Sequence, residues 1–154
     1  MKKKNYLFLL LSLILILAGC SANTQKKSKG ISVVATTDFY GEVAKAVLGN
    51  HGSVTSIINN PNIDPHDFEP TTKTAKTVAN SDILLYNGIG YDSWAKKLSG
   101  AKKIAVGEDI MNKKDGDNEH LWYNSKTMPA VAEYLAKRFG KIDSKHKKEY
   151  LANH

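Results

Sequence analysis

The stretch ISVVATTDFYGEVAKAVLGNHGSVTSIIN, residues 31–59, decides the fold class of this chain. Residues 31–37 are mostly β-branched or apolar and predict a buried strand. Residues 39–49 place apolar side chains at helical spacing and end in glycine, which is typical of a helix that stops there. Because residues 54–59 return to a strand pattern, the stretch predicts a strand–helix–strand unit with parallel strands.

Strands and helices continue to alternate after this unit, so we predict an α/β fold with a parallel four-stranded sheet flanked by helices. Residues 111–118 form a polar loop, and Asp143 is a candidate N-cap for a final helix, on which Tyr150 and Leu151 offer an apolar face. The other predicted elements are a helix at 72–80, a strand at 82–88, a helix at 94–98, a strand at 102–107, a short strand or extended segment at 120–123 and a helix at 125–142.

The N-terminus has the pattern of an export signal. Lysines at residues 2–4 precede an apolar run at 6–17, which is shorter than the ~20 residues that a membrane-spanning helix needs. The run ends in LAGC at residues 17–20, which resembles the bacterial lipobox, where the cysteine is lipidated and becomes the first mature residue. We therefore expect a lipoprotein signal peptide at 1–19 and a lipid on Cys20; the alternative is a buried structural cysteine behind an ordinary signal.

Residues 20–30 are polar and predict a flexible tether, with a root-mean-square reach of roughly 18 Å for ten residues. Three of the seven excess positive charges lie in the signal, which leaves +4 without long basic blocks. No nucleic-acid recognition motif accompanies this charge, so we expect no nucleic-acid partner. The chain has one cysteine, which excludes an intramolecular disulfide.

Five histidines are candidates for binding chemistry. His51, His146 and His154 lie in a glycine-flanked turn or on a lysine-rich helix, and we expect them to be solvated. His66 lies in DPHDFEPT, residues 64–71, directly after the second predicted strand. Ligands of α/β sheets gather beyond the carboxyl ends of the strands, where this loop is expected to lie.

Carboxylates surround His66, at Asp64, Asp67 and Glu69, and a metal-binding imidazole usually donates its second N–H to such a group. His120 follows the fourth predicted strand, so it should lie at the same edge of the sheet as His66. Two neutral imidazoles suit a divalent transition metal. Two ligands are too few for a tight site, because zinc takes about four.

Three segments resemble successive parts of the metal-binding solute receptors of bacterial ABC importers for zinc or manganese. They are DPHDFEPT at 64–71, NSDILLYNGIGYDSW at 80–94 and EHLWYNS at 119–125. By this resemblance, His66 and His120 are the two metal ligands of the amino-terminal lobe. The residues expected to shape the site around them are Asp64, Glu69, Pro70, Asn87 and Trp94.

The resemblance implies a two-lobed receptor, in which residues 31–139 form the metal-binding lobe and residues 140–154 begin the helix that links the lobes. The implied partners are an ABC permease and the carboxyl lobe, which supplies the remaining ligands and is truncated, encoded separately or absent from this sequence. The implied location is the extracytoplasmic face of a cell membrane, of Gram-positive type, with lipid anchoring. The polar loop at 111–118 lacks the histidines common in zinc receptors, so zinc and manganese both stay open.

Two other classes of function compete with a receptor. A small metallohydrolase would need three protein ligands and a base, and neither HExxH nor Gly-x-Ser-x-Gly occurs, so we expect no enzyme. The other alternative is a surface adhesin or truncated remnant that keeps the fold without tight metal binding. Stoichiometric metal binding that depends on His66 would argue against it.

Overall fold

A computed structural model describes residues 30–154 of the chain. The predicted signal peptide at 1–19, the lipidated Cys20 and the tether, up to residue 29, lie outside the described residues. The described part contains one four-stranded sheet in the order β2-β1-β3-β4, and all of its paired strands are parallel. The strands are β1 (Ile31–Thr37), β2 (Gly52–Ile58), β3 (Ile83–Tyr86) and β4 (Lys102–Ala105).

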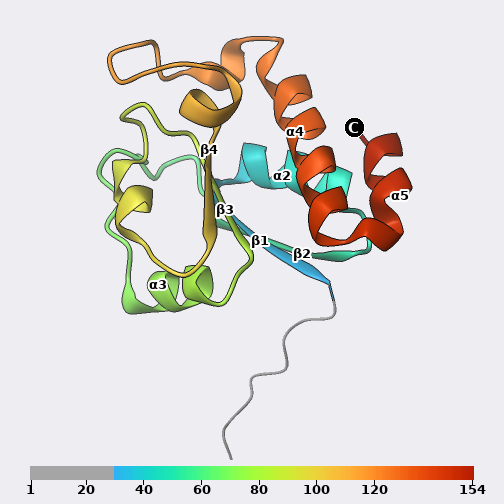
Figure 1. The fold of residues 1–154 in the computed structure, drawn as a ribbon. Coiled ribbons are helices and arrows are strands. Elements are labelled where there is room, and N and C mark those ends of the chain that lie inside the picture. Colours follow the sequence, from blue (N-terminus) through green and yellow to red (C-terminus); the bar gives the residue numbers. More distant parts are fainter. Residues whose placement is uncertain (1–29) are drawn as a thin grey trace, which may run out of the picture.

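Helices cover both faces of this sheet, so the fold has three layers (Figure 1). One face packs against α2 (Asp38–Leu48), α4 (Thr127–Ile142) and α5 (Lys147–Ala152), and the other against α3 (Thr72–Ala79). The predicted α/β class and the parallel sheet are therefore confirmed. The predicted end of the first helix is also correct, because Gly49 has φ +58°, a conformation that glycine adopts without strain.

The two cores follow from the alternation of side chains along the central strands. In β1, Val33 and Ala35 pack toward α2 and α4, whereas Val34 packs toward α3. In β3, Leu84 faces the α3 side and Leu85 faces the α2 side. Because successive side chains of a strand point to opposite faces, a strand between two helical layers must be apolar at every position.

Three predicted elements differ from the structure. Residues 120–123 were expected to be extended, but Leu121–Tyr123 form a 3-10 turn, which buries Leu121 in the core. The predicted helix at 94–98 is a 3-10 helix at Ser93–Lys97. The fourth strand ends at Ala105, and Val106–Ile110 form a π-helical turn, in which Asp109 Oδ2 accepts a hydrogen bond from the Ala105 amide at 2.8 Å.

The C-terminal segment folds back onto the helical layer formed by α2 and α4 on one face of the sheet (Figure 1). Tyr150 was expected to lie on an open apolar face, yet its side chain is fully buried against Phe139 of α4. Leu151 is 37% exposed. Asp143 precedes the 3-10 turn Ser144–His146 at the cap position, and its carboxylate accepts from the side chains of His146 and Tyr150.

No helix within residues 30–154 is long and apolar enough to cross a membrane.

Candidate metal centre

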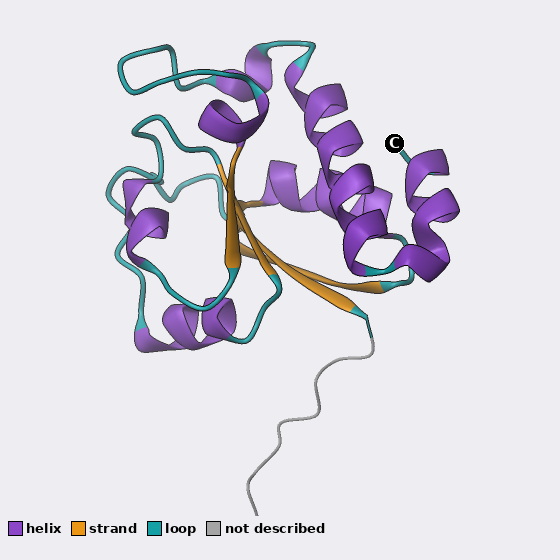
Figure 2. Cartoon of the chain, in the orientation of Figure 1, coloured by secondary structure: helices purple, strands orange, loops and turns teal. Residues whose placement is uncertain are grey.

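The loops that follow β2, β3 and β4 meet beyond the carboxyl ends of the parallel strands, called the carboxyl edge of the sheet below. These loops carry the candidate site (Figure 2). His66 lies in the loop after β2, where its backbone amide donates to Asp64 Oδ1 at 2.9 Å, as in an Asx turn. The same loop is tied to the rest of the fold by Trp94, whose Nε1 donates to the Pro65 carbonyl at 3.0 Å. Trp94 also stacks against Phe68, with ring centroids 4.7 Å apart. His66 is thus presented by a loop that is held on both sides.

His120 lies in the loop between the π-helical turn and α4. Its backbone amide donates to Asn118 Oδ1 at 3.0 Å, and its ring Nδ1 lies 3.1 Å from the same oxygen. An amide oxygen only accepts hydrogen bonds, so Nδ1 carries the proton in the neutral ring. This tautomer leaves Nε2 of His120 with a free lone pair, which is the state that a metal ligand needs.

Tyr91 lies next to both histidines. Its ring centroid is 5.0 Å from that of His66, in an edge-to-face arrangement, and 6.4 Å from that of His120. The structure therefore brings His66 and His120 close to one aromatic ring. Burial raises the pKa of Tyr91, and the carboxylates of Asp64, Asp92 and Glu119 raise it further.

Glu119 supplies a carboxylate to the same place. Its Oε1 lies 3.0 Å from Nε2 of His66, and its side chain is 26% exposed. Within residues 30–154, His66, His120 and Glu119 do not form a group whose ligand atoms all lie within 4.8 Å of one another. A cation that took all three would have to draw His120 or Glu119 inward, and both lie in the same exposed loop.

A buried carboxylate, Asp92, holds the loop that carries Tyr91. Asp92 Oδ2 accepts hydrogen bonds from Thr36 Oγ1 at 2.6 Å and from the Asn87 amide at 2.8 Å, and Oδ1 accepts from the Gly88 amide at 2.9 Å. Thr36 belongs to β1, and Asn87 follows β3. Asp92 therefore joins the ends of the two central strands, at the point where the strand order reverses and where ligands of such sheets bind.

Burial raises the pKa of Asp92, and the hydrogen bonds from Thr36, Asn87 and Gly88 oppose this shift without cancelling it. The side chain is fully buried. Burying a carboxylate costs free energy unless hydrogen-bond donors surround it. Here one hydroxyl and two backbone amides donate to it.

Asn87 connects this junction to the loop of His120. Its Oδ1 accepts from the buried Tyr40 hydroxyl at 2.7 Å, and its Nδ2 donates to the Glu119 carbonyl at 3.0 Å. The carbonyl of Glu119 in turn accepts from the Leu121 amide at 2.8 Å. Asn87 thereby fixes the backbone immediately before His120.

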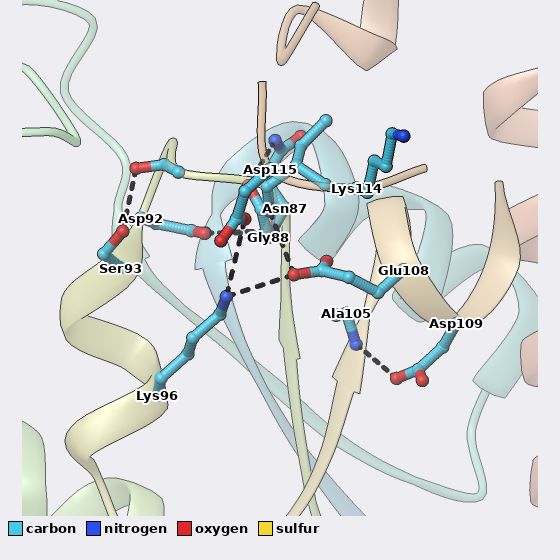
Figure 3. Close-up of polar contacts among 12 residues, drawn as sticks. Asn87, Gly88, Asp92, Ser93, Lys96, Ala105, Glu108, Asp109, Lys114 and Asp115 are labelled. Carbon is cyan, nitrogen blue, oxygen red and sulfur yellow. Dashed lines mark hydrogen bonds and ion pairs between the residues drawn. The ribbon is translucent and has the colours of Figure 1, made fainter. Parts of the chain in front are cut away.

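The turn after Asn87 is tight. Gly88, Ile89 and Gly90 all have positive φ, and a Cβ on Gly88 would lie 1.9 Å from Glu108 Oε2. Glu108 also accepts from the Ile89 amide and pairs with Lys96 at 3.1 Å, as Figure 3 shows beside Asn87, Gly88 and Asp92. The pKa of Lys96 is raised by this hydrogen bond. The φ of +79° at position 88 favours glycine there, whereas the Glu108 side chain is flexible and can move away from an added Cβ.

A pocket of about 530 Å³ opens beside the histidines, and neither His66 nor His120 is among the residues that line it. Its walls come from the end of β1, the loop after β2, Tyr91 and the 3-10 turn after His120. Tyr123, at its rim, is 81% exposed, and Ile63 is 38% exposed. This edge of the sheet is thus open and partly apolar.

The residues expected to shape the site differ in whether they make contacts there. Asp64, Asn87 and Trp94 make the contacts described above, and Pro70 is half-buried. Glu69 is exposed and makes no hydrogen bond or ion pair within the described residues. Sequence reasoning missed Tyr91 and Asp92; the signal for Asp92 was an acidic residue four positions after a strand-ending Asn-Gly. The assignment of His66 and His120 as metal ligands stays a prediction.

Donors and charges at this edge suit a divalent cation. The site offers two imidazoles and one carboxylate, a set that zinc and manganese both accept. The three-layer α/β fold thus carries two imidazoles and one carboxylate at the carboxyl ends of its strands.

The chain belongs to the family described as the periplasmic component A of the zinc-uptake complex, whose model matches residues 33–154. A metal ABC transporter substrate-binding lipoprotein, ScbA of Streptococcus cristatus, is 30% identical over 174 residues and is matched by 99% of this chain. The manganese-binding lipoprotein MntA of Halalkalibacterium halodurans is 27% identical over 164 residues. The chain covers 56% and 54% of these two proteins, so it spans about half the length of its relatives.

Solved structures show the same fold. The periplasmic zinc-binding protein TroA from Treponema pallidum matches with a TM-score of 0.67 and 19% identity, over 80% of this chain and 48% of that one. The manganese-bound periplasmic metal-binding protein from Candidatus Liberibacter asiaticus matches with a TM-score of 0.68 and 22% identity, over 80% and 50%. The expected likeness to one lobe of a two-lobed receptor is confirmed at the level of the fold.

Replacing Asp92 by Asn tests the junction of β1 and β3. The variant keeps the size of the side chain but turns an N–H toward one of the present donors, so one charge-assisted hydrogen bond is lost. We expect the free energy of unfolding, measured with urea, to fall by about 1.5–3 kcal/mol. Asp115→Asn is the matched control, since that side chain is 75% exposed, and should change stability by less than about 0.5 kcal/mol. Equal effects of the two substitutions would contradict the role of Asp92.

Proposed function

We propose that this chain is the metal-capturing lobe of an extracytoplasmic solute receptor, which binds zinc or manganese for an ABC importer. One observation carries the proposal: the rings of His66 and His120, which lie 54 residues apart in the sequence, come within 5.0 and 6.4 Å of the same Tyr91 ring at the carboxyl ends of the strands. Family membership supports it, since the relatives named above are a metal ABC transporter lipoprotein and a manganese-binding lipoprotein.

In this proposal His120 coordinates through Nε2, because Nδ1 faces Asn118. His66 coordinates through the nitrogen that now faces Glu119, and the carboxylate of Glu119 either joins the metal as an oxygen ligand or moves aside. Both imidazoles must be neutral to bind, so acid releases the metal. Tyr91, held by the Asp92 junction, packs near both rings and helps to position them.

The donor set is incomplete for tight binding. Zinc takes four ligands and manganese more, mainly oxygen, whereas this lobe offers two imidazoles and one nearby carboxylate. A carboxyl lobe, which the family resemblance implies, would complete the coordination over the open edge that exposes Tyr123 and Ile63. We infer that residues 31–139 act as the metal-binding lobe and that 140–154 lead toward that second lobe.

The chain would act as a carrier rather than an enzyme. Its related proteins are named as substrate-binding lipoproteins, and neither HExxH nor Gly-x-Ser-x-Gly occurs in the sequence. The competing proposal is an adhesin or remnant that keeps the fold without binding metal, for which the exposed Tyr123 is the main argument.

Calorimetric titration with zinc and with manganese tests the site in the full chain, held in detergent and carrying Cys20→Ser so that no thiol binds zinc. We expect His66→Ala and His120→Ala each to abolish one equivalent of bound metal, because each removes an imidazole from a set with no spare. The affinity of that equivalent should fall as the pH is lowered.

His154→Ala is the matched control, since it removes an exposed histidine far from the candidate site. It should leave this equivalent of metal unchanged. If neither His66→Ala nor His120→Ala changes the amount of metal bound, the receptor proposal fails for this lobe and the adhesin proposal replaces it.

We further propose that the chain is anchored by a lipid on Cys20 at the outer face of a membrane, of Gram-positive type. The LAGC sequence after an apolar run supports this, as do relatives that are named lipoproteins. The polar residues up to Gly30 would then place the metal lobe within reach of a permease.

Metabolic labelling with radioactive palmitate in a Gram-positive host measures the anchor directly. The full chain should incorporate label and fractionate with membranes, whereas Cys20→Ser should lose the label because no thiol remains to accept the lipid. Ser21→Ala, which leaves the cysteine in place, should be labelled like the unmodified chain. Label that persists in Cys20→Ser would contradict the assignment.

A further inference from the structure

A second group of potential metal ligands lies at the amino ends of the strands, at the opposite end of the sheet from His66 and His120. His51 occupies the turn immediately before β2, at the amino end of the strands, and its carbonyl accepts from the Ile31 amide at 3.0 Å. His146 and Glu149 come from the C-terminal segment, where the 3-10 turn meets α5. A ring nitrogen of each histidine and a carboxylate oxygen of Glu149 all lie within 4.8 Å of one another. Both histidines were expected to be solvated, whereas the structure leaves them only 21% and 25% exposed and pairs each with a carboxylate.

His51 is held close to Glu149. Its Nε2 lies 2.7 Å from Glu149 Oε2, and the side chains are 21% and 59% exposed, respectively. The His51 ring also meets the edge of the buried Tyr150 ring, at 5.5 Å and 90°. The imidazole is therefore fixed in place, while the carboxylate beside it is free to adjust.

His146 is oriented by a carboxylate of its own. Its Nδ1 lies 2.6 Å from Asp143 Oδ2, which also accepts from the Tyr150 hydroxyl at 2.9 Å. A carboxylate oxygen accepts hydrogen bonds, so Asp143 Oδ2 accepts from both the Tyr150 hydroxyl and the His146 ring. Nδ1 of His146 must then carry a proton, which leaves Nε2 as the nitrogen able to coordinate. A carboxylate that fixes the tautomer of a histidine in this way is the usual arrangement behind a metal ligand.

The two imidazole rings stack, with centroids 3.9 Å apart and planes inclined by 18°. The stacking brings a nitrogen of each histidine and a carboxylate oxygen of Glu149 within 4.8 Å of one another, which is close enough for one cation to bind all three after local movement.

From this geometry we propose that His51, His146 and Glu149 bind a divalent transition cation, separate from the one at His66 and His120. Two imidazoles and a carboxylate are ligands that zinc, among the first-row cations, accepts in tetrahedral geometry with water as the fourth ligand. Asp143 acts as the positioning residue for His146. The proposal does not depend on metal binding at the carboxyl edge.

A small movement completes the coordination. Ligand atoms about 2.1 Å from a tetrahedral zinc ion lie about 3.4 Å apart, so Glu149 Oε2 must draw back slightly from His51. Its exposed side chain allows this without disturbing the core. The bound ion would then tie α5 to the turn between α2 and β2, adding to the hydrogen bond from Asn153 Nδ2 to the Val47 carbonyl at 3.2 Å. Metal binding here would stabilise the C-terminal helix against the lobe.

Zinc titration in a chain that lacks the first site tests this proposal. The background is the full chain in detergent with Cys20→Ser, His66→Ala and His120→Ala, so any zinc bound is independent of the proposed receptor site. We expect one equivalent of zinc, a higher unfolding temperature in its presence, and ¹⁵N chemical shifts that place the metal on Nε2 of His146. His51→Gln or Glu149→Gln in this background should abolish the zinc-dependent rise in unfolding temperature.

Asp143→Asn should weaken the binding about 10- to 100-fold without abolishing it, as expected of a residue that orients a ligand. His154→Ala is the control and should bind zinc as the background does. Circular dichroism of each variant without metal checks the fold, and the glutamine variants alter only partly exposed side chains. If the background binds no zinc, or if His51→Gln and Glu149→Gln bind it as tightly as the background, the proposal is overturned.

Discussion

The carboxylate of Asp92 is the constraint on which the rest of the carboxyl edge depends. It is fully buried, and it accepts hydrogen bonds from Thr36 at the end of β1 and from the amides of Asn87 and Gly88 after β3. A carboxylate in this position would destabilise the core if these donors did not surround it. Its burial therefore couples the packing of the two central strands to the shape of the loop that carries Tyr91.

The candidate site follows from that junction in two steps. Tyr91 lies next to Asp92 and meets both histidine rings, while Asn87 binds the Glu119 carbonyl and so fixes the chain before His120. His66 is positioned from the other side, through Trp94 and the Pro65 carbonyl. The loops after β3 and β4 are thus tied to Asp92, directly or through Asn87, and the loop after β2 is tied to Trp94. These contacts limit how far the two imidazoles can move apart, which favours the proposed capture of one cation.

Much of the fold could be predicted from the sequence, because strands buried on both faces give continuous apolar runs such as residues 31–37. The placement of His66 and His120 at one edge followed from the parallel strands alone. The 3-10 turn at Leu121–Tyr123 and the π-helical turn at Val106–Ile110 could not be predicted, since tertiary contacts of Leu121 and Asp109 decide them. The pairing of His51 with His146 depends on how the C-terminal segment folds back, and local patterns carry no signal for that.

A crystal structure of the zinc-loaded chain, with anomalous data at the zinc edge, tests the central claim most directly. The account predicts an anomalous peak beside Tyr91, about 2.0–2.1 Å from one ring nitrogen of His66 and from Nε2 of His120. A peak bound to only one of these histidines, or no peak at the carboxyl edge at saturating zinc, would contradict it.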